Sequence, residues 1–462
     1  MEKRKCIVMK YKLALPMVLL SGLLFAVLAW KMDTNAGPDE MMRYSVAEWI
    51  VTHNALPTGF EFELINPYWG YSYAFTPYLP TMIAALFVKA ASLFSSELQV
   101  LLFAARLVNV FAGMGTVYVA FRIGDRLFAN KGSVYFFAAV MAYLPQFTFL
   151  AGYLNNDMMS LLAAFMILDA VMSGDANGWS VRNMLYLAFG VSISALTYFF
   201  GYGWILFAVA GFFYTSIRRA EDKKKVMRNA GIIVLFVLAI AGWYFIRNAV
   251  IYHGDFLGYR AQSECVELYK QQELRWPVNN PGMRSMFLRD MLTRGRWTET
   301  TIESLIGMFG GMTICLDGKF YDLYQASFWM CVLLFTLYRY KTKDKLKTPM
   351  LFMLLFVFIF PIVFSIYSSY TRDFSPQGRY IITIMPVVCV LMSMGIDECS
   401  KAVEQKYEGS KPALSRFGRL IPYLAAISLF IVFIIIYYTV MLPTLTFTVL
   451  PGADKVSFYW VR

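Results

Sequence analysis

The sequence predicts an all-α integral membrane protein, because its composition and its patterning agree. The 462 residues are 58% hydrophobic and only 16% charged, with a mean hydropathy of +0.53, whereas soluble domains are about 45–50% apolar and about 25% charged. The apolar residues gather in runs of membrane-spanning length, and aromatic residues are abundant, with 40 Phe, 30 Tyr and 10 Trp. Trp and Tyr favour the two membrane–water interfaces. We therefore expect a bundle of transmembrane helices.

Eleven apolar runs are candidate spans, since about 20 mostly apolar residues cross a membrane. They lie at about 13–31, 99–121, 133–151, 158–173, 183–200, 202–217, 230–248, 324–339, 349–368, 380–397 and 420–442. The first run follows a basic segment and precedes no convincing cleavage site, so it is expected to be an uncleaved helix with a cytoplasmic N-terminus. One more run, beginning at Thr76, is interpreted as a helix lying in the outer interface.

The net charge of +12 arises from basic clusters that separate the apolar runs. Placing the Thr76 run in the interface puts every cluster on one side of the membrane, which the positive-inside rule makes cytoplasmic. The clusters are Lys3–Lys12, Arg122–Lys131, Arg218–Arg228, Arg339–Lys347 and Lys401–Arg419. This distribution indicates topology and excludes nucleic acid as a partner. The loops expected outside are 32–98, 152–157, 249–323 and 369–379, with a short tail after Leu442.

The first outer loop contains the stretch GPDEMMRYSVAEW, beginning at Gly37. If this stretch is helical, Asp39 and Arg43 share one face, as do Glu40 and Tyr44. Acidic residues also suit the positive N-terminal end of a helix, whatever their function. The residues alone leave open whether the two carboxylates only begin a helix or serve an active site at the membrane surface.

A second acidic position, Asp157, begins a span at its outer end after Asn155 and Asn156. Asn and Asp are common N-caps, which is one interpretation. The other is that Asp157 faces Asp39 across the outer surface. Two facing carboxylates could hold a divalent cation such as Mg²⁺ or Mn²⁺, or they could divide into a base and an orienting partner. The candidate metal ligands are therefore Asp39 and Asp157.

Two arginines at outer ends of spans are candidate anion ligands. Arg247, followed by Asn248, ends one span, and Arg379, between Gln377 and Tyr380, begins another. Guanidinium groups match phosphate oxygens, although an arginine at a helix end also reaches lipid headgroups.

The long outer loop carries two further features. Cys265 and Cys315 could pair in an oxidising exterior or remain free thiols. The segment TTIESLIGMFGGM, from Thr300, is too short to span and suits an interfacial helix or the lining of a groove.

The order of these motifs resembles that of the GT-C glycosyltransferases, membrane enzymes that use polyprenyl-phosphate sugars and include protein O-mannosyltransferases and lipid A aminoarabinose transferases. The similar features are the Asp-Glu pair followed by RY and AEW, Asn-Asn-Asp at an outer helix start, and WYFIRN before a loop. IGMFGG and QGRYI look like a bacterial branch of the superfamily. The sequence departs from the family pattern at Thr76-Pro77, where a His-Pro-Pro or Lys-Pro-Pro often precedes the interfacial helix.

The resemblance implies three segments: a conserved transmembrane module at 1–255 with a catalytic first outer loop at 32–98, an outer loop at 256–323 that shapes the acceptor or donor groove, and C-terminal helices with a short outer tail at 324–462. It also implies an inverting transfer of sugar, on the outer face of the plasma membrane, from a polyprenyl-phosphate donor to a hydroxyl of a glycan, a lipid or a protein. Asp39 would be the general base. The remaining implied roles are catalytic support by Glu40 and Asp157, phosphate binding by Arg247, Arg379 and Asn248, and acceptor or supporting contacts by Arg43, Tyr44, Asn156, Gln377 and Tyr380.

Two other functions stay open at this point. A flippase or transporter would hold ionisable residues near the middle of the membrane and often shows internal repeats, and neither feature is evident here. A polymerase or ligase that uses lipid-diphosphate glycans would release a lipid diphosphate, whereas the expected transferase releases a lipid monophosphate.

Overall fold

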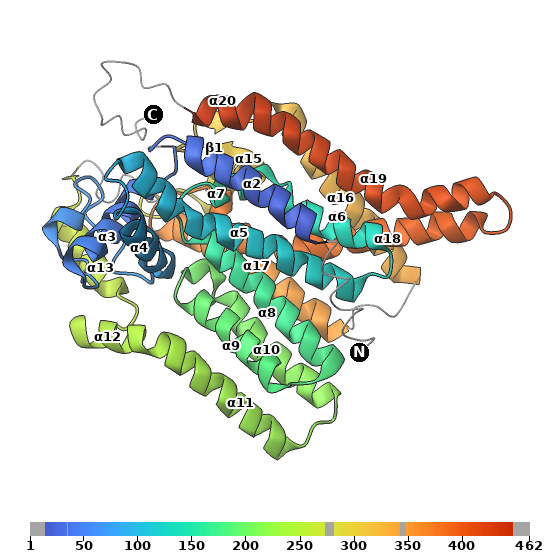
Figure 1. The fold of residues 1–462 in the computed structure, drawn as a ribbon, viewed down its shortest axis with the longest axis horizontal. Helices are drawn as coiled ribbons and strands as arrows, with labels where there is room; N and C mark the ends of the chain where they lie inside the picture. The colour runs from blue at the N-terminus through green and yellow to red at the C-terminus, as the bar shows by residue number, and fades with distance from the viewer. Residues whose placement is uncertain (1–13, 35, 273–280, 342–347, 447–462) are drawn as a thin grey trace.

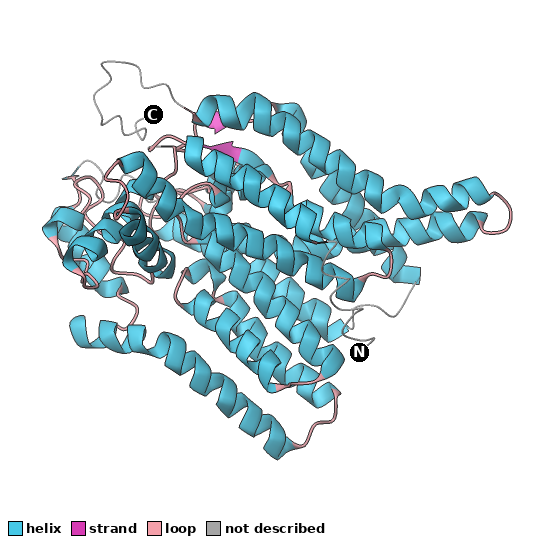
Figure 2. Ribbon diagram, viewed as in Figure 1, coloured by secondary structure: helices cyan, strands magenta, loops and turns pink. Residues whose placement is uncertain are grey.

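A computed structural model describes residues 14–34, 36–272, 281–341 and 348–446 of the chain. The described part is a helical bundle with one short β-hairpin (Figures 1 and 2). The basic cluster Lys3–Lys12 and most of the expected outer tail lie outside the described residues. The predicted all-α membrane architecture is confirmed.

Eight helical segments of the described chain are long and apolar enough to cross a membrane, or nine if α6 (Lys131–Ala142) and α7 (Pro145–Ala151), which meet at 61°, form one bent span. The eight segments are α5 (Leu98–Leu127), α8 (Asp157–Asn177), η2 with α10 (Phe199–Gly201, Gly203–Arg218), α11 with η3 and α12 (Lys223–Val237, Leu238–Gly242, Trp243–Ile251), α16 (Gly318–Lys341), α17 (Thr348–Thr371), η5 with α18 (Gly378–Ile384, Met385–Tyr407), and α19 with η6 and α20 (Pro412–Ile436, Tyr437–Met441, Leu442–Leu445). The expected count of eleven is not confirmed, because α2 (Leu15–Lys31) and α9 (Val181–Ala195) have only 17 and 15 residues.

Different segments of the chain lie at the two ends of the bundle. At one end, the loop after α2 contacts the end of α20, where the Asp33 amide donates to the Leu445 carbonyl at 3.0 Å. At the other end, Asn130 contacts the Arg419 carbonyl at 3.4 Å, so two of the basic clusters meet there. Figure 1 shows α3 (Glu40–His53), α4 (Leu79–Ala91) and α13 (Tyr259–Tyr269) at the first end and the connection between α18 and α19 at the second. Two of the basic clusters therefore lie at the end opposite to α3, α4 and α13.

The run that begins at Thr76 forms α4, a helix of 13 residues. At about 1.5 Å per residue this helix is roughly 20 Å long, which is too short for a hydrocarbon core of about 30 Å. It packs against α3 and α5 through Ala84, Ala85 and Val88. A helix of this length agrees with the interfacial position that the charge pattern favours.

The long loop before α16 contains most of the remaining local structure. The TTIESLIGMFGGM segment is helical as far as Gly307 and then forms one strand of a hairpin, so only its first part is the expected helix. The elements in order are η1 (Phe62–Leu64) in the first loop, then α14 (Leu288–Leu292), α15 (Trp297–Gly307), β1 (Met308–Phe309) and β2 (Ile314–Cys315) in the long loop. The strands are antiparallel, with Met308 opposite Cys315. Cys265 is buried, Cys315 is exposed, and both are free thiols.

Close helix packing in the bundle depends on small residues, as is common in membranes. The clearest case is Gly395 of α18, which lies against the backbone of α16. A Cβ atom added there would come within 2.2 Å of the Cys331 carbonyl oxygen. Because the obstacle is backbone, a side chain at this position forces the two helices apart.

Gly395→Ala is expected to lower the free energy of unfolding by about 1–3 kcal/mol, the usual cost of overpacking. The measurement is thermal unfolding of the purified protein in one detergent. Gly231→Ala is the matched control, because Gly231 lies on the exposed face of α11 with no atom within 4 Å of an added Cβ. The control should match or exceed the wild type, since Ala favours a helix by roughly 1 kcal/mol over Gly. Equal melting temperatures for Gly395→Ala and the wild type would contradict this account of the packing.

Candidate functional site

The turn between α2 and α3 determines where the two adjacent carboxylates point. Gly37 packs against the ring of Tyr153, where an added Cβ would lie 2.6 Å from a ring carbon. Asp39 directly precedes α3 and has a left-handed backbone, with φ of 61° and ψ of 7°. This conformation costs a non-glycine residue about 1–2 kcal/mol, although Asp tolerates it better than most. Asp39 and Glu40 consequently diverge instead of lying side by side.

The Asp39 carboxylate forms an ion pair with Arg379, the second residue of η5. The Arg379 Nη2 atom donates to Oδ2 of Asp39 at 2.8 Å, and the carboxylate side chain is 24% exposed. Burial alone would raise the pKa of Asp39, but the guanidinium groups of Arg379 and Arg43 outweigh it and hold the pKa below its usual range. Asp39 is therefore an anion at neutral pH.

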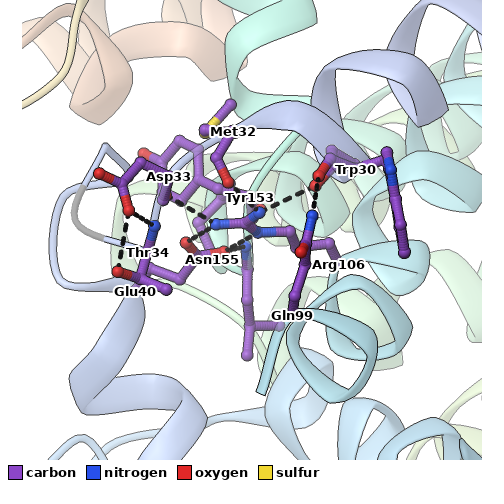
Figure 3. A network of polar contacts seen from close by, with 11 residues as sticks. Trp30, Met32, Asp33, Thr34, Glu40, Gln99, Arg106, Tyr153 and Asn155 are labelled. Carbon is purple, nitrogen blue, oxygen red and sulfur yellow. Dashed lines mark hydrogen bonds and ion pairs between the residues drawn. The ribbon is translucent and has the colours of Figure 1, made fainter. Parts of the chain in front are cut away.

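The Glu40 carboxylate points the other way, into the protein, and binds Arg106 of α5 (Figure 3). The two Glu40 oxygens accept from Nε and Nη2 of Arg106 at 2.8 and 2.6 Å. One of them also accepts from the Leu154 amide at 2.8 Å. The Arg106 guanidinium donates its other hydrogen bonds to the carbonyls of Ala29, Met32 and Asp33 at 2.7 to 3.0 Å. Glu40 is completely buried, so its role in this structure is to fix the turn that carries Asp39.

Arg43 is a second guanidinium at the site, one helical turn after Asp39. Its side chain is buried, and its Cζ atom lies 3.8 Å from the centre of the Tyr73 ring. Stacking on the ring face leaves the N–H groups free to bind other atoms. Within the described residues, its Nε and Nη1 atoms are buried and have no hydrogen-bond partner. Such unpaired donors on a buried cation are costly unless an anion binds to them.

Asp157 completes the cluster from the first residue of α8. It is buried, and its Oδ1 atom has no hydrogen-bond partner in the described part of the chain. Asp39, Arg43 and Arg379 are all close enough to interact with it electrostatically. The structure therefore brings together Asp39, Asp157 and Arg379, as the sequence predicted.

Tyrosines form the wall around these charges. Burial raises the pKa of Tyr71, Tyr73 and Tyr153 far above the usual value for a phenol, and the carboxylate of Asp39 raises it further. All three stay neutral, so their hydroxyl groups can donate hydrogen bonds to an anion or to a hydroxyl.

Arg247 and Asn248, expected at the donor phosphate, lie in a different contact. The Arg247 Nη2 atom donates to the carbonyls of Leu56 and Pro57 at 2.9 and 2.7 Å, and Nη1 donates to the Asn248 side chain at 3.3 Å. In the described residues, Arg247 makes no contact with Asp39 or Arg379. Its guanidinium holds the first outer loop onto α12, and phosphate binding by this pair stays a prediction.

The other expected residues divide between the site and its support. Gln377 contacts the site directly, because its Oε1 atom accepts from Nε of Arg379 at 2.6 Å. Tyr380 stacks on Phe200, with ring centres 4.9 Å apart and planes 6° from parallel. Asn156 instead joins two loops, since its amide donates to the carbonyls of Pro77 and Thr197.

Tyr44 is part of the hydrophobic core and not of the site's surface. Its side chain is 2% exposed, and burial, together with the charge of Glu48, raises its pKa to about 12. A role in acceptor contacts stays a prediction for this residue.

The side chains around Asp39 and Asp157 are poorly suited to bind a divalent cation. In the described parts of the chain, no three His, Cys, Asp or Glu side chains gather in a metal-binding arrangement. Asp39 is already paired with Arg379, and Arg43 adds a second positive charge nearby. Hard cations need several oxygen ligands, and two guanidinium groups repel them. The expected metal role of Asp39 and Asp157 therefore has no support from the neighbouring residues.

Arg106 was not identified from the sequence, although a signal for it exists. It is the one charge within the apolar run 99–121, and an ionisable residue inside a span almost always faces a partner. Tyr73 and Tyr153 gave no comparable signal, because tyrosines are frequent throughout the chain and at any membrane interface.

No protein-family model and no curated protein sequence matches the chain, but solved structures share its fold. ArnT from Cupriavidus metallidurans, bound to undecaprenyl phosphate, is similar with a TM-score of 0.51 and 14% identity, over 94% of this chain and 73% of that one. The archaeal oligosaccharyltransferase AglB from Archaeoglobus fulgidus, in complex with an inhibitory peptide and a dolichol-phosphate, is similar with a TM-score of 0.55 and 14% identity, over 92% of this chain and 55% of that one. Both are GT-C proteins, so the chain is a multi-pass membrane protein with a GT-C fold, and that prediction is confirmed.

Glu40→Gln is expected to lower the free energy of unfolding by about 3–5 kcal/mol, because it leaves the buried Arg106 cation without its counter-charge. Thermal unfolding in detergent measures the loss. Glu264→Gln is the control, since its partner Arg260 is exposed and 3.6 Å away, and such pairs contribute at most about 1 kcal/mol. If both variants have the same melting temperature as the wild type, the Glu40–Arg106 pair does not have this structural role.

Proposed function

We propose that this protein is an inverting glycosyltransferase that moves a sugar from a polyprenyl-phosphate donor to a hydroxyl of a glycan, lipid or protein acceptor. The observation that carries the proposal is the cluster of the partly exposed Asp39 with the buried Arg379, Arg43 and Asp157 at the loop-rich end of a GT-C fold. The fold agrees with the proposal, since two proteins of similar structure bind an undecaprenyl phosphate and a dolichol-phosphate. In this proposal the site end faces the outside of the plasma membrane and the N-terminus lies in the cytoplasm, an orientation that the basic clusters of the sequence favour.

The two guanidinium groups are suited to the donor's phosphate. Arg43 carries unpaired N–H groups, and Arg379 lies across Asp39 from it. Guanidinium N–H groups match phosphate oxygens in geometry and stay charged at any relevant pH. Fixed cations here stabilise the negative charge that grows on the phosphate as it leaves. Because a phosphate departs as an anion, this chemistry needs no strong general acid.

Asp39 is the proposed general base. The acceptor hydroxyl attacks the anomeric carbon, its proton passes to the Asp39 carboxylate, and the bond from that carbon to the phosphate oxygen breaks with its electron pair going to the oxygen. Attack opposite the leaving group inverts the anomeric centre. Asp157 orients the acceptor from the start of α8, while Glu40 supports the turn. A positioned base contributes about 10²–10⁴-fold to the rate.

Donor binding is expected to change the basicity of Asp39. In the structure, Arg379 holds the pKa of this carboxyl down, which keeps it charged but makes it a weak base. A phosphate that binds Arg379 competes with Asp39 for the same N–H groups and adds negative charge beside it. Both effects raise the pKa of Asp39 when the donor is in place.

The decisive experiment offers the purified protein a panel of polyprenyl-phosphate sugars with candidate acceptors. Release of polyprenyl monophosphate is expected, and Asp39→Asn should slow it by about 10²–10⁴-fold because the base is lost. Glu48→Gln, at an exposed acid on the helix that follows Asp39, is the control and should retain wild-type activity. Full activity of a folded Asp39→Asn variant would refute the assignment of the base. Release of a lipid diphosphate from diphosphate-linked donors would instead favour a polymerase or ligase, and counterflow without transfer a transporter.

The pH profile tests the pairing of Asp39 with Arg379. Because the pKa of Asp39 is lowered, its carboxylate persists above about pH 4, the usual value, and is lost only as the pH falls through the lower pKa of the folded protein. The profile of kcat/KM should show no acid limb from Asp39 between about pH 5 and 7. In Arg379→Gln the acid limb of the kcat/KM profile should move to a pH about 1–3 units higher, since the cation that lowers the pKa of Asp39 is gone. Arg260→Gln, an exposed arginine, should leave the profile unchanged, and an unshifted limb in Arg379→Gln would contradict the pairing.

A further inference from the structure

A second cavity adjoins the charged cluster on the far side of Tyr380. Its volume is about 210 Å³, and it lies between α17 and the segment around η2. The cavity is smaller than the pockets of about 300–1,000 Å³ that bind drug-sized ligands. A ligand of this size is a single ring with its substituents.

One wall of the cavity is a polar stripe on an otherwise apolar helix. Ser365, Ser368 and Ser369 of α17, followed by Arg372, have the spacing i, i+3, i+4 and i+7, which places them on one helix face. Polar groups inside an apolar span are kept where they meet a partner or line a cavity.

Ser365 shows that the polar wall has unused hydrogen-bonding capacity. Its side chain is 1% exposed, it lines the cavity, and its hydroxyl has no partner among the described residues. Serines in helices often bond back to the preceding turn, as Thr371 does to the Tyr367 carbonyl. Ser369 is different, because it already accepts from Trp297 and donates to the Ser375 carbonyl. Ser365 is thus a buried hydroxyl in the cavity wall without a hydrogen-bond partner among the described residues.

The opposite wall is aromatic, formed by Tyr198, Phe200 and Tyr380. Tyr380 is stacked on Phe200, and the Tyr198 ring lies 6.1 Å from it at 43°, so the wall is packed and its rings are fixed. A surface of aromatic rings facing hydroxyl groups suits a ligand with an apolar face and a polar edge.

The cavity lining carries charges of both signs. Arg372 lies over the Tyr259 ring at 4.3 Å, and Asp373 pairs with Lys270 at 3.7 Å. The cavity therefore offers hydroxyl groups, ring faces, a guanidinium and a carboxylate. A carboxylate in the lining repels an anionic ligand, whereas a neutral ligand with hydroxyl groups can donate to it and accept from the guanidinium.

We propose that this cavity binds one neutral sugar ring, with Ser365 donating to or accepting from a ring hydroxyl and the aromatic wall covering the ring's apolar face. The proposal rests on the proposed glycosyl transfer, and it identifies Ser365 and Ser368 as residues that determine sugar specificity. The ring belongs either to the donor, whose phosphate then lies at Arg379 beside Tyr380, or to a glycan acceptor. Both sources present the same chemistry to the cavity.

The test uses Ser365→Val, which removes the hydroxyl and fills part of the cavity, and Ser365→Ala, which only removes the hydroxyl. Val363→Ile on the lipid-facing side of the same helix is the control. In nanodiscs, the affinities for bare polyprenyl phosphate and for polyprenyl-phosphate hexoses and pentoses are measured, with the KM of the acceptor. Saturation-transfer NMR with free methyl glycosides reports sugar binding without any lipid phosphate or turnover.

If the donor's sugar occupies the cavity, both Ser365 variants should bind sugar-bearing lipids roughly three- to ten-fold more weakly, the effect of one lost hydrogen bond, and bind the bare lipid as the wild type does. If an acceptor's sugar occupies it, both lipids bind normally and the acceptor KM rises by a similar factor. The proposal is overturned when stably folded variants match the wild type in lipid affinities, acceptor KM and glycoside saturation transfer. If the wild type binds no polyprenyl phosphate at all, the proposed glycosyl transfer is refuted. The saturation-transfer signals of the glycosides would still show whether the cavity binds a sugar ring.

Discussion

The buried pair of Glu40 and Arg106 is the interaction on which the rest of the site depends. Removing two charges from water is expensive, and an ion pair in the interior is stable only when further hydrogen bonds satisfy both groups. Arg106 meets this condition, because its guanidinium also binds the carbonyls that end α2, where the helix dipole is negative. The Arg106 side chain therefore fixes the positions of α2, α3 and α5 relative to one another. It thereby also fixes the position of Asp39, which precedes Glu40.

The same logic explains the polar residues around the site. The loops of the site end come from distant parts of the chain, and side chains that bind backbone carbonyls help to hold them together, beside two small apolar clusters. Arg247 fixes the segment at Leu56 and Pro57, and Asn156 joins the segments at Pro77 and Thr197. In the sequence, these residues look like residues that bind a substrate. A side chain that holds a loop in place and a side chain that binds a substrate are both polar and both lie at the outer end of a helix. Only the geometry separates the two roles.

The sequence predicted the parts of the structure that depend on averages over many residues. Hydropathy gave the membrane bundle, and the distribution of basic residues predicted which loops gather at one end. The same distribution put Asp39, Asp157, Arg247 and Arg379 on one side of the membrane, but sidedness could not show that Arg379 pairs with Asp39 while Arg247 binds the carbonyls of Leu56 and Pro57. The number of spans was less predictable, since α2 and α9, with 17 and 15 residues, are shorter than the apolar runs at 13–31 and 183–200. Run length cannot show where the backbone leaves the helix.

The directions of the Asp39 and Glu40 side chains could not be predicted from the sequence, because they depend on one local backbone torsion. A helical reading of GPDEMM treats Asp39 and Glu40 as neighbours on one turn, but Asp39 lies outside the helix with a positive φ. That single torsion sends one carboxylate toward Arg379 and the next toward Arg106. Its cost, about 1–2 kcal/mol, is smaller than the roughly 3–5 kcal/mol that would be lost if either partner of the buried Glu40 pair were removed. The fold can therefore hold Asp39 in a strained conformation, and the adjacent acids have separate tasks because the strain separates them.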